Sequence, residues 1–301
     1  MEPWIAITIA AAFLQNLRSA LQKHLRTSLG TTGASFVRFG FGFPLAIAYV
    51  MGLHHFAGYA FPVLNPGFVF WSVVGGLAQI FATILLVYLF SLRNFAVGTA
   101  YSKTEPVQAA IFGLILLGER LTPGAVAAII VGVFGVMMIS VARVPLSWRN
   151  LFAALAGRTA LIGIASGAVF GISAVAYRSA ALSLDGPNPI MQAAVTLACV
   201  TTFQTLFMLV WMLVKDPSEI GRVARSWRSS SLVGCAGVMG SACWFTAMAL
   251  QQVAYVRALG QIELLFTFAA SIFVFRERIN RMEVAGCVLI VTGILFLLMW
   301  K

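Results

Sequence analysis

The chain has 301 residues, of which 60% are hydrophobic and only 10% are charged, and its mean hydropathy is +0.94. Water-soluble globular domains carry about 25% charged residues, so this composition argues against a soluble protein. The net charge of +11 would suggest nucleic acid as a partner of a soluble protein. In a membrane protein, however, Lys and Arg concentrate in cytoplasmic loops and face anionic lipid. We therefore expect the lipid bilayer, and no nucleic acid, as a partner.

Apolar runs of about 20 residues recur along the whole chain, and a helix of that length crosses the hydrocarbon core of a bilayer. The runs are continuously apolar, which favours helices over a closed barrel. Five spans are predicted in the first half: Trp4–Leu21, Thr32–Leu53, Gly67–Phe90, Phe95–Leu117 and Pro123–Ala142. Five more follow in the second half: Thr159–Leu182, Pro189–Val214, Ser231–Leu250, Ala254–Phe275 and Arg281–Trp300. The expected fold class is all-α integral membrane, with ten transmembrane helices.

Three predicted spans begin with a small polar residue followed by proline, which is the pattern of a helix N-cap with Pro at the first helical position. The pairs are Asn65-Pro66, Thr122-Pro123 and Asn188-Pro189. The connections between spans are short, and Arg143–Arg158 is the natural divide between the halves. We assign residues 1–145 to the first half and residues 159–301 to the second.

The basic residues are distributed unequally between the two sides of the predicted bundle. Thirteen of the 20 Lys and Arg residues lie in the loops that follow the odd-numbered spans, and four lie on the opposite side. Loops rich in Lys and Arg stay in the cytoplasm. The count therefore places the loop Lys215–Arg228 in the cytoplasm and both chain termini outside.

The few acidic residues indicate an internal repeat. Glu105 and Glu119 are 14 residues apart, as are Glu263 and Glu277, and an offset of 158 residues relates the two pairs. The same offset relates further positions: Ala96 and Ala254, Ala100 and Ala258, Arg120 and Arg278, Thr122 and Asn280, Ala127 and Ala285, Gly135 and Gly293. With five helices per half, equivalent helices must cross the membrane in opposite directions. Such inverted repeats are typical of alternating-access transporters, which bind their solute near the midplane between the repeats.

The same segments resemble a known family. The first copy contains Ala78-Gln79, Tyr88, Thr104-Glu105-Pro106 and Leu117-Gly118-Glu119-Arg120-Leu121. This pattern resembles an EamA-type domain of the drug/metabolite transporter superfamily. The second copy repeats it as Gln261-Ile262-Glu263 and Phe275-Arg276-Glu277-Arg278, with Leu264 in place of the proline and Arg276 in place of the glycine.

The resemblance covers essentially the whole chain as two tandem EamA-like repeats. It implies a ten-helix basket around a central cavity and the transport of amino acids, other metabolites or cationic drugs. Members commonly keep both termini in the cytoplasm, whereas the charge count places them outside; the superfamily also contains oppositely oriented relatives.

Ionisable side chains inside a span cost about 2.5–3.5 kcal/mol on insertion scales, so each is a functional candidate. Amides and aromatic residues within the spans join them. The candidate substrate-binding residues are Arg18, Arg38, Gln79, Tyr101, Glu105, Gln108, Trp244, Gln261 and Glu263. We expect no catalytic residue.

Helical spacing separates these candidates by face. Tyr101, Glu105 and Gln108 share one face of the fourth span, and Lys103 points elsewhere. On the ninth span Arg257 and Gln261 share a face, while Glu263 points away from it.

Two interpretations of the acids stay open. Glu105 and Glu263 occupy equivalent positions in the repeat and both could contact the solute or a proton in the cavity. Alternatively, each pairs with a buried base to hold helices together, with Arg18 and Arg38 as available partners. Arg18 and Lys103 could instead lie near helix ends and extend to the lipid headgroups.

The function expected is that of a secondary transporter, an exporter or exchanger that moves a small amino-acid-like or drug-like solute across the inner membrane. No Walker-type GxxxxGK[ST] sequence occurs, so the chain has no ATP motor of its own. A membrane-embedded enzyme is the alternative from another class, although HExxH and GxSxG are absent. A passive channel is the third possibility.

We expect no cofactor and no metal. The four cysteines, Cys199, Cys235, Cys243 and Cys287, all fall in apolar runs without a CxxC pair, where Cys behaves as a small hydrophobic residue. The expected partners are the small-molecule substrate, the bilayer, and a proton or counter-substrate.

Overall fold

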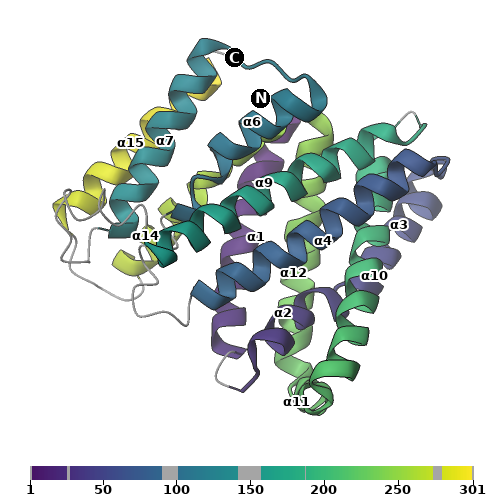
Figure 1. Ribbon diagram of the computed structural model, residues 1–301. Coiled ribbons are helices and arrows are strands. Elements are labelled where there is room, and N and C mark those ends of the chain that lie inside the picture. The colour runs from purple at the N-terminus through teal and green to yellow at the C-terminus, as the bar shows by residue number, and fades with distance from the viewer. Residues whose placement is uncertain are drawn as a thin grey trace. The chain divides into compact units, whose positions relative to one another are not determined.

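The computed structural model describes residues 2–25, 28–89, 101–141, 157–186, 188–273 and 280–299. In the first half these form α1 (Pro3–Leu25), α2 (Thr31–Gly40), α3 (Phe43–Ala57), α4 (Pro66–Leu89), α6 (Glu105–Leu117) and α7 (Pro123–Val141) (Figure 1). In the second half they form α9 (Arg158–Ser183), α10 (Pro189–Lys215), α11 (Pro217–Arg225), α12 (Trp227–Leu250), α13 (Val253–Leu259), the 3-10 turn η1 (Gly260–Ile262), α14 (Glu263–Phe273) and α15 (Arg281–Met299). The predicted all-helical class is confirmed for the described residues.

Within the described residues, seven helical segments are long and apolar enough to cross a membrane: 3–22, 31–57, 66–86, 158–183, 189–215, 227–250 and 281–299. Large apolar side chains on these segments, such as Val214 at 71% exposure, present the kind of surface that faces lipid. α6 and α7 are apolar but shorter, and the ninth predicted span is divided among α13, η1 and α14. Residues 95–100 of the fourth span and the motif Phe275–Arg278 lie outside the described residues, so the count of ten spans stays a prediction.

The predicted helix caps are confirmed. The side chains of Asn65, Thr122 and Asn188 each accept a hydrogen bond from a backbone N–H two or three residues on, at 2.8, 3.2 and 2.9 Å. At the start of α15, Asn280 accepts from the N–H of Met282 at 3.1 Å, while Glu283 accepts from the N–H of Asn280 at 3.0 Å. This reciprocal arrangement is a capping box. The caps fix where the helices begin because they satisfy N–H groups that the helix itself leaves without partners.

The 158-residue offset found in the sequence recurs in the helix boundaries. Adding 158 to both bounds of α7 gives both bounds of α15, and adding it to 31 and 57 gives 189 and 215, the bounds of α10. The first residues of α6 and α14, Glu105 and Glu263, are related in the same way. The two halves therefore repeat their local structure over most of their length.

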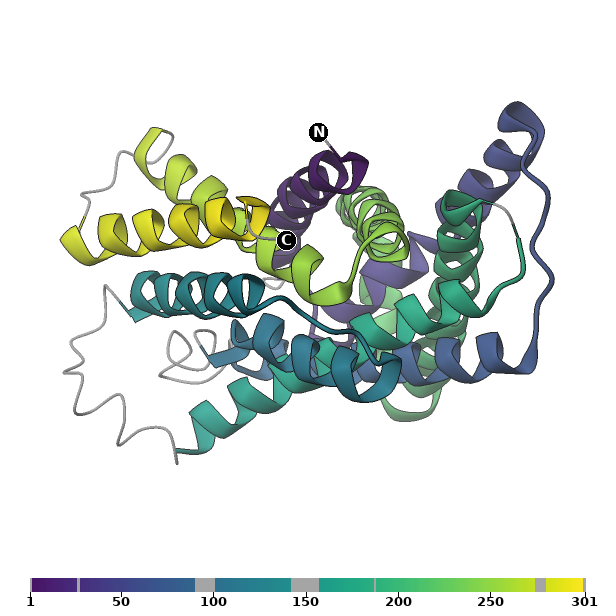
Figure 2. The same cartoon turned by 90° about the horizontal axis from the view of Figure 1, so that it is seen from above.

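The equivalent helices α7 and α15 lie side by side (Figures 1 and 2). A Cβ atom added at Gly135 would lie 2.7 Å from the carbonyl oxygen of Gly286, and one added at Gly293 would lie 2.9 Å from that of Ala128. The two backbones therefore touch directly, as small residues allow in membrane helices. The 158-residue offset converts one contact into the other, because it relates Gly135 to Gly293 and Ala128 to Gly286. From the first contact to the second, the residue number falls along α7 and rises along α15. The pair is therefore antiparallel and locally two-fold symmetric.

The chain forms two compact units that do not coincide with the sequence halves. Unit 1 comprises Met1–Ile80 and Ala176–Gln251, and unit 2 comprises Phe81–Val175 and Gln252–Lys301. Each unit thus combines segments of both halves, and α4 and α9 contribute residues to both units. In unit 1, α12 packs against α1, α2 and α10; in unit 2, α7 packs against α15, and α13 against α6.

In unit 1 a buried acid joins α11 to the start of α2. Glu219 is fully buried, and its carboxylate accepts a hydrogen bond from Arg222 Nε at 2.6 Å. The same carboxylate lies against Gly30 and Gly33, where an added Cβ would meet Glu219 Oε1. Negative charge is favoured at a helix N-terminus. This contact therefore helps to position α2, which carries Arg38.

The α7–α15 contact predicts a marked difference between two glycine substitutions. Gly135→Ala should lower the melting temperature, because its Cβ meets rigid backbone, and such overpacking costs about 1–3 kcal/mol. Gly52→Ala in α3 is the matched control, since among the described residues no atom beyond the local helix backbone and the two neighbouring residues lies within 4 Å of the added Cβ, and it should leave the melting temperature unchanged or slightly raised. Thermal unfolding of the purified protein measures both. Equal melting temperatures for the two variants would contradict the close packing.

Candidate functional site

The nine residues proposed from the sequence divide between the two compact units. Unit 1 contains Arg18, Arg38, Gln79 and Trp244, and unit 2 contains Tyr101, Glu105, Gln108, Gln261 and Glu263. The two groups differ in chemistry, because the candidates in unit 1 include two arginines and those in unit 2 include two acids. Each group is described within its own unit.

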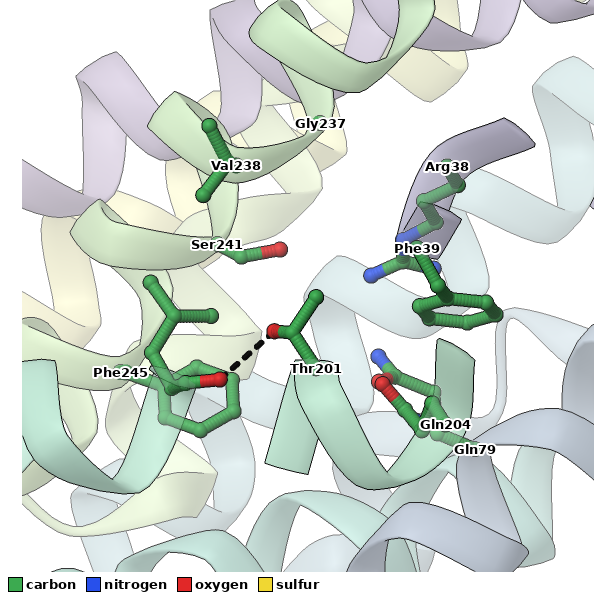
Figure 3. Close-up of a pocket in the computed structure, with 10 residues that line it drawn as sticks. Arg38, Phe39, Gln79, Thr201, Gln204, Gly237, Val238, Ser241 and Phe245 are labelled. Carbon is green, nitrogen blue, oxygen red and sulfur yellow. Dashed lines mark hydrogen bonds between the residues drawn. The ribbon is translucent and has the colours of Figure 1, made fainter. Parts of the chain in front are cut away.

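Unit 1 contains a pocket among α2, α4, α10 and α12, and two of the predicted residues, Arg38 and Gln79, line it (Figure 3). The other lining residues are Phe39, Leu197, Thr201, Gln204, Gly237, Val238, Ser241 and Phe245. The lining thus combines one guanidinium, two amides, two hydroxyls and apolar or aromatic side chains. A few polar groups set in an apolar wall is the usual composition of a small-molecule site.

A buried hydrogen-bond network forms one wall of this pocket. The hydroxyl of Tyr177 donates to Gln79 Oε1 at 2.7 Å, and Gln204 Nε2 lies 3.1 Å from each of three oxygens, Gln79 Oε1, the Tyr177 hydroxyl and the Gly76 carbonyl. The three side chains are at most 8% exposed. Tyr177 also stacks on Phe245, with ring centroids 4.4 Å apart. A connected buried network of this kind holds its members in fixed orientations, so Gln79 has a structural role in the pocket wall.

The two arginine side chains of unit 1 converge on one glycine. A Cβ atom added at Gly237 of α12 would lie 3.4 Å from both Arg18 Cδ and Arg38 Cγ. The aliphatic parts of both side chains therefore lie against the same part of α12. Trp244 is 6% exposed and lies seven residues beyond Gly237, on the same face of α12. The sequence placed these residues inside spans but could not show that they meet.

In unit 2 the fourth and ninth predicted spans are interrupted at equivalent positions. Residues Lys103-Thr104 form a turn before α6 begins at Glu105. η1 interrupts the ninth span before α14 begins at Glu263. These interruptions correct the prediction of two continuous helices. Each leaves an acid in the first turn of the helix that follows, where the helix dipole favours negative charge.

The two candidate acids of unit 2, Glu105 and Glu263, form ion pairs. Arg257 Nε lies 3.1 Å from Glu105 Oε1, and Lys103 Nζ donates a hydrogen bond to Glu263 Oε1. The sequence had suggested Arg18 and Arg38 as the bases, with Lys103 and Glu263 on other faces. The partners differ because the interruptions change the direction in which side chains leave the helix, which a spacing of 3.6 residues per turn does not anticipate.

The remaining candidates of unit 2 take part in packing. Gln108 Nε2 donates to the carbonyl oxygen of Ile164 on α9 at 3.3 Å. Tyr101 is 2% exposed and packs with Ala160. The amide of Gln261 lies directly against Gly132 of α7, where an added Cβ would lie 2.5 Å from Gln261 Oε1. These contacts give each residue a structural role, and contact with a solute stays a prediction for all three.

The Glu105–Arg257 pair predicts coupled effects on stability. Both side chains are less than 20% exposed, so removal of either charge takes an opposite charge away from a partner that is poorly solvated. Glu105→Gln and Arg257→Gln should each lower the melting temperature, and the double variant should lose less than the sum, with a coupling energy of about 0.5–3 kcal/mol. Asp216→Asn is the control, because its ion pair with Arg222 is exposed and worth about 0–1 kcal/mol. Strictly additive losses would contradict a direct pair.

Comparison with known proteins identifies the family. The model of the EamA-like transporter family matches the chain twice, at residues 2–141 and 157–299. A solved structure described as "Crystal structure of protein" has a TM-score of 0.73 at 18% sequence identity, and the match covers 97% of this chain and 95% of the other. That likeness shows a shared fold. No curated protein sequence matches the chain. The two family matches confirm the resemblance seen in the sequence and show a multi-pass membrane transporter of the drug/metabolite type: the chain belongs to the EamA-like transporter family.

Proposed function

We propose that the protein is a secondary transporter that carries a small amino-acid-like or drug-like metabolite across the inner membrane by alternating access, as an exporter or an exchanger. The observation that carries this proposal is the antiparallel α7–α15 contact, in which residues related by the 158-residue offset exchange places. Inverted repeats of this kind allow one half to adopt the conformation of the other, which opens the binding site to alternate sides of the membrane.

The full architecture in this proposal is two five-helix inverted repeats around a central cavity. Its support comes from the seven long apolar helices, the two family repeats and the shared helix boundaries at an offset of 158 residues. Five spans per repeat invert the second repeat relative to the first. With the excess of Lys and Arg in the cytoplasm, both termini lie outside and the segment containing α11 lies inside.

The interrupted spans carry the acids that would respond to a proton or to a cationic group of the solute. Discontinuous helices that end near the membrane interior commonly form the solute and ion sites of transporters. Glu105 and Glu263 begin the two helices that follow the interruptions, and each is paired with a base, Arg257 or Lys103. A proton, or a cationic group of the solute, competes with the base for the carboxylate. This exchange of partners can link solute or proton binding to movement of the helices.

Two other functions, a passive channel and a membrane-embedded enzyme, predict different behaviour of the protein in reconstituted vesicles. A passive channel would conduct solute without acceleration by solute on the opposite side, and a membrane-embedded enzyme would release a covalently altered product. The inverted repeat, with one broken span in each half, favours the carrier, because a channel or an enzyme has no general need for two equivalent, oppositely oriented halves.

The test compares charge-removing variants of the acids in reconstituted vesicles. The solute is the compound from a metabolite panel that raises the melting temperature most, because ligands that bind the native state stabilise it. Glu105→Gln or Glu263→Gln should lower exchange at least tenfold at unchanged yield. Glu119→Gln, the acid between α6 and α7, is the control and should exchange at the wild-type rate.

Wild-type exchange by both Glu105→Gln and Glu263→Gln across a range of pH would exclude both acids as binding or coupling residues. Solute flux without acceleration by solute on the opposite side would identify a channel. A chemically altered product would identify an enzyme.

A further inference from the structure

We propose that the segment Lys215–Arg228 of unit 1, which contains α11, binds the headgroups of anionic phospholipids. The binding site, the α11 surface, consists of the exposed side chains of Lys215, Arg225, Trp227 and Arg228. This inference goes beyond transport, because it assigns a lipid partner to a surface outside the pocket of unit 1.

Positive charge dominates the α11 surface. The segment contains four basic and two acidic residues. Both acids, Asp216 and Glu219, pair with Arg222, and Glu219 is fully buried. Within the described part of the chain, the three basic residues of the α11 surface form no ion pair. They therefore present three positive charges at the surface of unit 1, which is complementary to an anionic partner.

The ends of two membrane-spanning helices fix the level of the α11 surface in the bilayer. The spanning segment of α10 ends at Lys215 and that of α12 begins at Trp227, and Figure 1 shows α11 where these two helix ends meet. In the adjoining turns of α10 and α12, Val214 is 71% exposed and Leu232 is 59% exposed. Such apolar side chains face the lipid tails. The basic residues therefore lie at the boundary between hydrocarbon and water, which is the level of the phospholipid phosphates.

Trp227 supports the same level. Its side chain is 56% exposed, and the guanidinium carbon of Arg228 lies 5.5 Å from its ring centroid. Tryptophan is enriched at membrane–water interfaces, because its ring is apolar while its N–H can reach the headgroups. The cation–π contact keeps the guanidinium of Arg228 beside this ring, and so at the depth of the headgroups.

The protein beneath holds α11 in place. Val223 is 5% exposed and packs in one cluster with Met212 of α10 and Val233 of α12. At the end of α11, the Ser226 hydroxyl donates to the carbonyl oxygen of Val223 at 3.1 Å. Because the backbone of the site is already ordered, binding of a headgroup has to order only the exposed side chains.

Headgroups on this surface would contact three structural elements at once. Lys215 belongs to the end of α10, Arg225 to the end of α11 and Arg228 to the start of α12. A lipid that binds the folded arrangement but not the unfolded chain raises the melting temperature. Stabilisation by lipid is therefore a direct measure of binding.

The test uses the purified full-length protein in a neutral detergent and two soluble short-chain lipids, dioctanoyl phosphatidylglycerol and dioctanoyl phosphatidylcholine. The anionic phosphatidylglycerol should raise the melting temperature more than the zwitterionic phosphatidylcholine. One Arg near an anionic lipid surface contributes about fivefold in affinity. Combined Arg225→Gln and Arg228→Gln should therefore weaken the apparent affinity for phosphatidylglycerol about 25-fold. Combined Arg225→Lys and Arg228→Lys retain the charges and should bind within about fivefold of the wild type.

The matched control removes two exposed arginines of unit 2. Combined Arg120→Gln and Arg281→Gln lower the net charge by the same amount and should bind phosphatidylglycerol like the wild type. Salt provides a test that needs no variant. In about 1 M salt, charge interactions extend only about 3 Å, so the advantage of phosphatidylglycerol over phosphatidylcholine should largely disappear.

Equal stabilisation by the two lipids, or wild-type affinity for phosphatidylglycerol in the Arg225→Gln and Arg228→Gln variant, would overturn the site. If that variant does not fold, the salt titration of the wild type decides: an advantage of phosphatidylglycerol that persists at high salt would contradict binding by charge. Inorganic phosphate that stabilises the protein as much as phosphatidylglycerol would assign the surface to a soluble anion and overturn the choice of a lipid.

Discussion

The requirement that charge inside a membrane be compensated within the protein governs the arrangement of unit 2. An isolated charge in a span costs about 2.5–3.5 kcal/mol on insertion scales. Glu105 and Glu263 meet this requirement through Arg257 and Lys103. Those pairs form because each span is interrupted immediately before its acid, which lets the acid sit in the first turn of a new helix. Each helix break therefore accompanies an ion pair, and this combination occurs once in each repeat.

Helices inside a bilayer associate without a hydrophobic driving force, and small residues help because they let the backbones pack closely. Gly135 and Gly286 bring the backbones of α7 and α15 into direct contact. These glycines thus fix a symmetric helix pair in unit 2.

Features that depend on local chemistry could be predicted from the sequence. The apolar runs and the N-caps at Asn65, Thr122 and Asn188 set helix positions because lipid solvation and capping act over a few residues. The offset between Glu105 and Glu263 was visible because acids are rare in this chain. The family followed from the same residues.

Features that depend on tertiary structure could not be predicted. An apolar run gives no sign of a 3-10 turn such as η1. The helix face on which Glu263 lies was therefore predicted wrongly, and its partner Lys103 was missed. Thr201 and Ser241 in the pocket resemble ordinary small polar residues of membrane helices. Only the meeting of α2, α10 and α12 distinguishes them.

Inverted orientation of the repeats is the central claim, and one pair of cysteines tests it directly. Ala60 and Ser218 are both exposed and are equivalent positions at the 158-residue offset, so inverted repeats place them on opposite sides of the membrane. In a background without native cysteines, a membrane-impermeant thiol reagent applied to intact cells should label Ala60→Cys and leave Ser218→Cys unlabelled until the membrane is opened. The reverse pattern would keep the inversion but contradict the orientation derived from charge. Labelling of both positions in intact cells would contradict inverted repeats and, with them, the proposed mechanism.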